Sequence, residues 1–184
     1  MIMKYFFVIS TFLATFFCSN LQAQKYQLSS SEVSFFSEAP MENIEAFNEE
    51  TKSIFDESSR EIAFIVPIES FIFDKSLMQE HFNENYLESD KYPDARFEGK
   101  LVNYDPNKEG EQQVRAKGTL TIHGVSQQVD VPGTVSRDSS GIDMEANFPV
   151  KVADYDIEIP KVVFYNIAEE VEIRVKLQYQ PYES

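Results

Sequence analysis

The sequence predicts an all-β domain of about eight antiparallel strands with one amphipathic helix. Three observations predict it. Most of the chain after residue 23 alternates apolar and polar side chains with the period of two that is typical of strands with one buried face. Turn-forming clusters at 105–110 and 137–141 separate the alternating stretches, and the clearest helical period lies at 76–88. Short strands at this spacing favour a closed barrel or a sandwich.

Residues 1–23 have the features of a secretory signal rather than of a folded segment. Lys4 supplies a positive start, an apolar run follows over 5–18, and Ala23 is the small residue that a signal peptidase needs. The run is too short to cross a bilayer core of ~30 Å, which takes about 20 apolar residues. We therefore expect cleavage after Ala23, a periplasmic or secreted protein without stable membrane insertion, and one domain over 24–184.

Cys18 is the only cysteine of the chain and lies inside this segment. A lipoprotein cysteine needs small residues directly before it, whereas Phe16 and Phe17 precede Cys18. We expect Cys18 to leave with the signal, and lipidation is the alternative. The mature chain then has no disulfide framework, so its own core must stabilise it.

Four strands are expected in the first half of the domain, at 32–38, 42–48, 61–68 and 95–104. The third of them carries apolar residues on both faces, which indicates that another part of the protein covers its outer side. Pro67 cannot donate to a strand ladder, so an edge or a bulge is expected there.

Four more strands are expected in the second half, at 114–122, 129–135, 142–152 and 171–179. Each has one apolar and one polar face. Along the last of them, valine, isoleucine, leucine and tyrosine occupy the odd positions, while charged and amide side chains occupy the even positions. The apolar faces of such strands are expected to meet in one interior.

The helix is expected over about 76–88. Ser76 followed by Gln79 fits a capping box, in which Ser76 is the N-cap and Gln79 reaches back to it. Leu77, Met78, His81, Phe82 and Tyr86 then recur at helical spacing and form an apolar stripe. This apolar stripe is expected to pack against the mouth of a barrel or the face of a sheet.

The charge excludes one class of function. The chain has 31 acidic and 16 basic residues and a formal net charge of −15 at pH 7. A general nucleic-acid binder needs a basic face that displaces counterions from phosphates, so none is expected. An acidic run is interpreted as a solvated face that discourages binding to anionic membranes. Its members are Glu42, Glu45, Glu49, Glu50, Asp56, Glu57 and Glu61.

The motifs of catalysis and metal binding are missing. The sequence has two histidines, His81 and His123, and no HExxH, CxxC or EF-hand pattern. His123 precedes Gly124 at a predicted hairpin turn, and we expect it to fix that turn by a side-chain to backbone hydrogen bond. A hydrolase or isomerase that uses His123 as its base is the alternative. Asp154 and Asp156 are interpreted as a solvated turn rather than a Ca²⁺ site, because no complete oxygen shell accompanies them.

The interior of the barrel is the remaining place for a function. An eight-stranded barrel is either just filled by its side chains or holds one small ligand, and the alternation alone does not decide between them. A long apolar ligand would bind through its buried area. At ~0.8 kcal/mol per buried CH₂, a twelve-carbon stretch supplies roughly 10 kcal/mol before the loss of ligand freedom.

Several segments resemble one known family. Leu120–Ser126 (LTIHGVS), preceded by Lys117-Gly118, resembles the signature hairpin of the YceI-like family, which consists of secreted, lipocalin-like proteins associated with polyisoprenoid binding. Ser89–Phe97 (SDKYPDARF) resembles its Ser-x-x-Tyr-Pro-x-Ala-x-Phe segment, 70–86 its helix-bearing insert, and Val33–Ser37 its opening strand. The resemblance covers essentially all of 26–180.

The resemblance implies an eight-stranded antiparallel lipocalin-like barrel with a helix at one side and an apolar tunnel that holds an isoprenoid chain. The expected function is that of a non-enzymatic periplasmic carrier of an isoprenoid quinone or polyprenyl lipid, with no other cofactor and no metal. The residues expected to line the tunnel or its mouth are Phe64, Val66, Phe71, Phe73, Met78, Phe82, Tyr86, Leu120, Ile122, Val129, Val131, Phe148, Val171, Ile173 and Val175.

A second hypothesis keeps the fold and changes the function. In it the core is filled, and the protein is a stress-response or interaction module that acts through its acidic surface. A continuous internal cavity favours the carrier, whereas a packed interior favours the module. A homodimer is compatible with either hypothesis.

Overall fold

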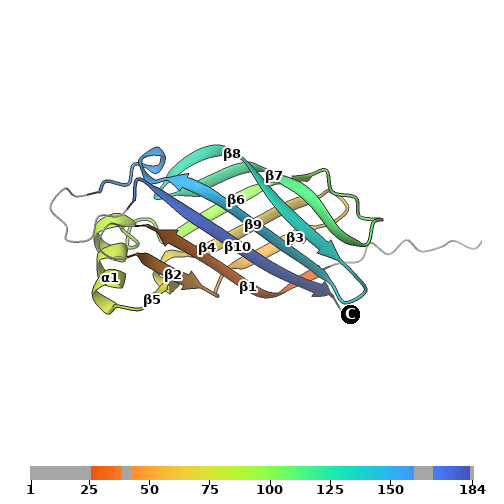
Figure 1. Ribbon diagram of the computed structural model, residues 1–184, viewed down its shortest axis with the longest axis horizontal. Helices are drawn as coiled ribbons and strands as arrows, with labels where there is room; N and C mark the ends of the chain where they lie inside the picture. The colour runs from red at the N-terminus through yellow and green to blue at the C-terminus, as the bar shows by residue number, and fades with distance from the viewer. Residues whose placement is uncertain (1–25, 39–42, 160–167, 183–184) are drawn as a thin grey trace, which may run out of the picture.

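The computed structural model describes residues 26–38, 43–159 and 168–182 of the 184-residue chain. The expected signal, with Cys18 and Ala23, lies outside the described residues, as does Glu42. Figure 1 shows an elongated barrel whose strands run obliquely along its length, with α1, β2 and β5 at one end. We call this the helix end, and the opposite end, which includes the turn between β8 and β9, the far end.

All described strands belong to one antiparallel sheet in the order β3-β4-β6-β7-β8-β9-β10-β1-β2-β5. The strands are β1 (Tyr26–Ser37), β2 (Ile44–Asn48), β3 (Lys52–Asp56), β4 (Glu61–Pro67), β5 (Ile72–Phe73), β6 (Asp94–Val102), β7 (Gly110–Ile122), β8 (Val125–Arg137), β9 (Ile142–Lys151) and β10 (Glu170–Pro181). The all-β antiparallel class is confirmed, and each of the eight predicted strands has a counterpart. Ten strands in an open ladder nevertheless differ from the predicted closed barrel of eight.

The two strands that the sequence did not predict have weak patterns. In β3, Phe55 is buried but Ile54 points outward and is 73% exposed, so apolar and polar positions do not alternate. β5 has two residues, too few to show a period. The prediction that the outer side of β4 is covered is wrong in part, because Ile65 is 39% exposed on that face.

The barrel closes through side chains where its ladder is interrupted. The chain turns a corner between β2 and β3, and the buried Asn48 holds it by donating to the carbonyl of Pro67 (2.7 Å) and accepting from the amide of Glu50 (2.9 Å). Within the described residues no backbone ladder joins β3 to β1 or β10. Ser53 of β3 instead lies 2.6 Å from the hydroxyl of Tyr179 on β10. We call this junction the seam.

Two glycines bring β6 and β7 unusually close together. Gly99 and Gly118 are register partners, and a Cβ on Gly118 would lie 2.2 Å from the carbonyl oxygen of Glu98. A Cβ on Gly99 would meet the ring of Phe97 at 2.6 Å. The missing side chains therefore leave room for Phe97, whose ring stacks on that of Phe64 with centroids 5.2 Å apart.

The predicted helix begins and continues differently from the pattern. α1 (Ser76–His81) starts after Lys75, which is the N-cap and makes no side-chain capping bond, so the predicted capping box is wrong. Ser76 already lies inside the helix and cannot act as its cap. The chain then continues as a π-helix, η2 (Phe82–Tyr86), closed by a bond from the Leu87 amide to the Phe82 carbonyl. Two 3₁₀ turns, η1 (Ile68–Ser70) and η3 (Val152–Tyr155), complete the structure.

Part of the acidic run is a buried polar cluster rather than a solvated face. The carboxylate of Glu57 accepts from Arg137 Nε at 3.0 Å and from the hydroxyl of Tyr104 at 2.6 Å. The Glu57 side chain is only 12% exposed, so the interpretation as a solvated residue is wrong for Glu57. This cluster joins the β3–β4 turn, the end of β8 and the loop after β6, and thus holds the far end of the barrel together.

Candidate functional site

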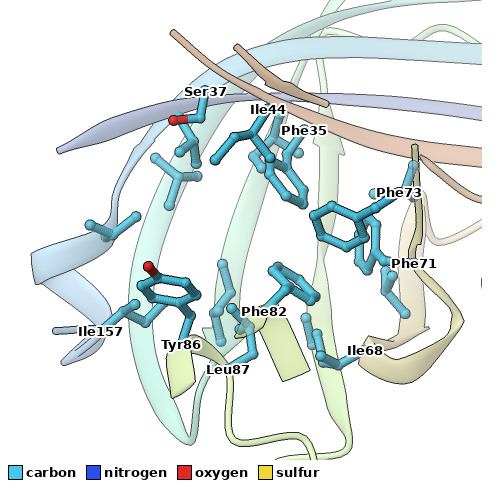
Figure 2. Close-up of a pocket in the computed structure, with 18 of the residues that line it drawn as sticks. Phe35, Ser37, Ile44, Ile68, Phe71, Phe73, Phe82, Tyr86, Leu87 and Ile157 are labelled. Carbon is cyan, nitrogen blue, oxygen red and sulfur yellow. The ribbon is translucent and has the colours of Figure 1, made fainter. Parts of the chain in front are cut away.

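The helix end of the barrel contains a cavity of about 150 Å³ with 25 lining residues. Each neighbouring strand contributes the side chains of its inward face, and α1 and η2 contribute Met78, His81, Phe82 and Tyr86. Figure 2 shows Phe82 and Tyr86 in this lining. Thirteen residues that the sequence singled out line it: Phe64, Val66, Phe71, Phe73, Met78, Phe82, Tyr86, Leu120, Ile122, Phe148, Val171, Ile173 and Val175.

The other two predicted residues lie deeper. Val129 and Val131 line a second cavity of about 60 Å³, nearer the far end. The two cavities have four lining residues in common: Phe64, Leu120, Phe148 and Val175. They are therefore adjacent chambers of one interior, separated by side chains rather than by backbone.

Sequence reasoning missed twelve lining residues: Val33, Phe35, Ser37, Ile44, Ile68, His81, Leu87, Ala95, Val150, Val152, Ile157 and Ile159. Two groups of these residues, one on β1 and one on β9, could have been found from the strand alternation. Val33, Phe35 and Ser37 alternate along one face of β1, and Val150 continues the inward face of β9 from Phe148. Ile157 and Ile159 follow η3 in irregular chain, where no period could identify them.

Four phenylalanines form one wall of the larger cavity. Phe82 of η2 stacks on Phe35 with ring centroids 5.4 Å apart, and contacts Phe71 at 5.5 Å and Phe73 at 5.0 Å. Figure 2 shows these rings turned toward one another across the cavity from three different segments. Such aromatic pairs stabilise beyond their buried area, so Phe82 helps to attach the helical segment to the strands.

His123 and Gly124 form the two-residue turn between β7 and β8, since Ile122 pairs with Val125. Their φ values are 51° and 75°, as a type I′ turn requires. The His123 ring reaches other segments: Nδ1 lies 3.2 Å from the carbonyl oxygen of Tyr155 and Nε2 lies 3.2 Å from a carboxylate oxygen of Glu88. The bond is to a backbone carbonyl as expected, but one on η3 rather than in the turn itself.

The surroundings of His123 fit positioning better than catalysis. Its ring meets Tyr92 edge to face at 4.5 Å, and neither of its hydrogen-bond partners is a nucleophilic hydroxyl or thiol. Hydrogen bonds from Lys91 and then from His123 hold the pKa of the Glu88 carboxyl below its ordinary value. Glu88 is thus an ionised acceptor that links the end of the helical segment to the hairpin.

The part of the chain that the structure describes shows neither a metal cluster nor a membrane-spanning helix. No three histidine, cysteine or acidic side chains gather there as a metal site would need, and no helix there is both long and apolar enough to span a bilayer. Asp154 and Asp156 lie in and just after η3 without a third ligand.

An oblique antiparallel sheet, a helix over one end and an interior lined by hydrocarbon define a barrel of the lipocalin-like kind. The family model for the YceI-like domain matches residues 25–179, so the chain belongs to the YceI-like family. A comparison with curated proteins gives no match.

Solved structures agree on the fold. A polyisoprenoid binding domain from Saccharophagus degradans is 18% identical over 86% of this chain and 99% of that chain, with a TM-score of 0.74. BcnA of Burkholderia cenocepacia is 20% identical over 80% of this chain and 95% of that chain, with a TM-score of 0.67. The YceI protein of Campylobacter jejuni is 16% identical over 98% and 100%, with a TM-score of 0.56.

Proposed function

We propose that this protein is a non-enzymatic carrier that binds a long apolar molecule, an isoprenoid quinone or a polyprenyl lipid, inside the barrel. The cavity at the helix end carries this proposal, because its lining consists almost entirely of hydrocarbon. An apolar cavity of about this size stays free of water and takes up small apolar molecules. The Saccharophagus relative, whose fold this chain has, is a polyisoprenoid binding domain, and this supports the same class of ligand here.

The two chambers suit a chain-shaped ligand. The larger chamber accepts a bulky apolar group, and the smaller one extends the space toward the far end. A chain that occupies both must displace the shared side chains of Phe64 and Phe148, which rotate without breaking the backbone ladder. Each additional buried CH₂ then contributes ~0.8 kcal/mol.

The proposal includes the place where the carrier works. The features of residues 1–23 support export and removal of that segment after Ala23, which leaves the barrel in the periplasm or outside the cell. N-terminal sequencing of the exported protein tests this part independently of ligand binding, and an intact N-terminus would contradict it.

The test of binding combines native extraction with one filled cavity. Mass spectrometry of organic extracts of the purified protein should detect an isoprenoid quinone or lipid. Ile173→Phe, which adds a ring inside the larger chamber, should remove it or weaken it several-fold. Ile54→Phe is the matched control, because Ile54 is 73% exposed on the outer face. If no lipid is recovered and quinones fail to bind in titrations, the carrier hypothesis is wrong and the module hypothesis is preferred.

A further inference from the structure

The polar side chains around the larger cavity are few, and they differ in solvent access and in hydrogen bonding. Of its 25 described lining residues, three carry oxygen or nitrogen in their side chains: Ser37, His81 and Tyr86. Ser37 is fully buried and its hydroxyl accepts the amide of Ala168 at 2.9 Å. His81 is partly exposed at the end of α1, where water can reach it. Tyr86 is the exception, because it is buried and faces hydrocarbon.

The Tyr86 residue is only 7% exposed, and burial, with no hydrogen bond to another described residue, accounts for its raised pKa. Figure 2 shows its hydroxyl pointing into the cavity, on the side that faces Ser37. Two other buried tyrosines are paired: the hydroxyl of Tyr104 with Glu57 and that of Tyr179 with Ser53, each at 2.6 Å. Tyr155 is also buried but does not line the cavity.

An unpaired hydroxyl in such surroundings is costly, and phenylalanine would fill the same volume without that cost. An ordered water at this hydroxyl would find only Ser37 and His81 as further polar side chains among the described lining residues. Burial raises the pKa of Tyr86, so the phenol is a neutral donor at ordinary pH. The position therefore fits a ligand that brings an oxygen acceptor of its own.

We propose that Tyr86 anchors the head group of the ligand by donating a hydrogen bond to an uncharged carbonyl oxygen, as a quinone ring presents. This inference rests on the proposed carrier function and narrows its ligand class. None of the described lining residues is a lysine or arginine, so these residues offer an anionic head group such as a phosphate no permanent opposite charge. A plain hydrocarbon would leave the Tyr86 hydroxyl unpaired.

The test compares three probes on the full chain: a short-tailed ubiquinone, squalene as a plain isoprenoid hydrocarbon, and geranylgeranyl phosphate. Tyr86→Phe should weaken the quinone about tenfold, which corresponds to about 1.4 kcal/mol, and leave squalene unchanged or slightly tighter. Tyr182→Phe, the same change at an exposed residue, should alter neither affinity. The carbonyl stretching frequency of the bound quinone should be lower in the wild type than in Tyr86→Phe.

Three results would overturn the inference. Equal weakening of quinone and squalene would mean that Tyr86 acts through shape alone. Tighter binding of the phosphate than of the quinone by the wild type would contradict the uncharged head group. Squalene binding with no preference for the quinone would leave the carrier standing and remove the anchor, whereas failure of all three probes would refute the carrier itself. If Tyr86→Phe does not fold, the wild-type preference among the three probes decides the matter, together with the carbonyl frequency of the bound quinone, which should be lower than that of the free quinone.

Discussion

His123 must adopt a positive φ for the hairpin turn, and its ring must also reach hydrogen-bond partners on two other segments. Its φ of 51° is one that asparagine adopts more readily than other non-glycine residues. Its two ring nitrogens face two acceptors, a backbone carbonyl and a carboxylate. The ring thereby connects the β7–β8 hairpin with η3 and with the segment after η2.

Replacing His123 with asparagine separates the two requirements. His123→Asn keeps a residue that suits the turn but removes both ring contacts, so the free energy of unfolding should fall by about 1 kcal/mol for the lost bond to the Tyr155 carbonyl alone. Urea unfolding measures this. Glu88→Gln is the companion variant, which keeps an acceptor but removes its charge, and the two losses should not add, because both weaken the same contact. Unchanged stability in His123→Asn would show that the turn alone matters.

Sequence reasoning reached the inward faces but not the polar details of single residues. Alternation placed Phe64, Leu120 and Ile173 inside the barrel, because a strand turns successive side chains to opposite sides. The same rule could not tell that Glu57 is buried against Arg137, since that pairing joins residues 80 positions apart. It also treated Tyr86 only as an apolar surface, because an unpaired hydroxyl becomes visible only when its neighbours are known.

Among the elements, β6 and β7 depend on the absence of side chains at their closest approach. Gly118→Ala places a Cβ against backbone atoms of Glu98 and Gly99, which cannot move as a flexible side chain can. We expect the free energy of unfolding to fall by about 1–3 kcal/mol, the usual cost of overpacking. Thermal unfolding measures this. Gly110→Asn is the control, because nothing surrounds Gly110 and asparagine tolerates its φ of 81°. Equal stability of the two variants would contradict the close approach.

Elements with a complete period could be predicted, and elements shaped by tertiary contacts could not. The long strands β7 to β10 show the alternation along most of their length. The sequence did not predict β3, because Ile54 faces outward and breaks the apolar alternation. The predicted capping box is absent, because the chain enters α1 through Lys75 in an extended conformation. The change from α-helix to π-helix at Phe82 follows the packing of that ring on Phe35, which no local pattern encodes.

For the whole molecule, buried phenols set the alkaline limit of stability. Burial raises the pKa of Tyr179 to about 12, and burial together with the Glu57 bond also raises that of Tyr104. Unfolded tyrosines ionise near pH 10. The stabilisation by these groups is therefore complete below about pH 10 and is lost as the pH rises toward about 12, because only the unfolded chain releases the protons readily.

Urea unfolding at increasing alkaline pH, followed together with tyrosinate absorbance, measures this dependence. The buried tyrosines should ionise after the exposed Tyr182 and together with unfolding. Tyr179→Phe should show a shallower decline between about pH 10 and about 12 than the wild type. Ionisation of all tyrosines near pH 10 with the barrel intact would contradict the burial argument.

The seam determines how easily the radius of the barrel can change. In a fully hydrogen-bonded barrel, the number and stagger of the strands fix the radius. Here the hydroxyls of Ser53 and Tyr179 and the Asn48 corner span the gap between β3 and the strands beyond it, while every other junction is a backbone ladder. Widening therefore costs a few side-chain bonds rather than a ladder. The cross-section of the barrel can therefore change at the seam more readily than at its other junctions.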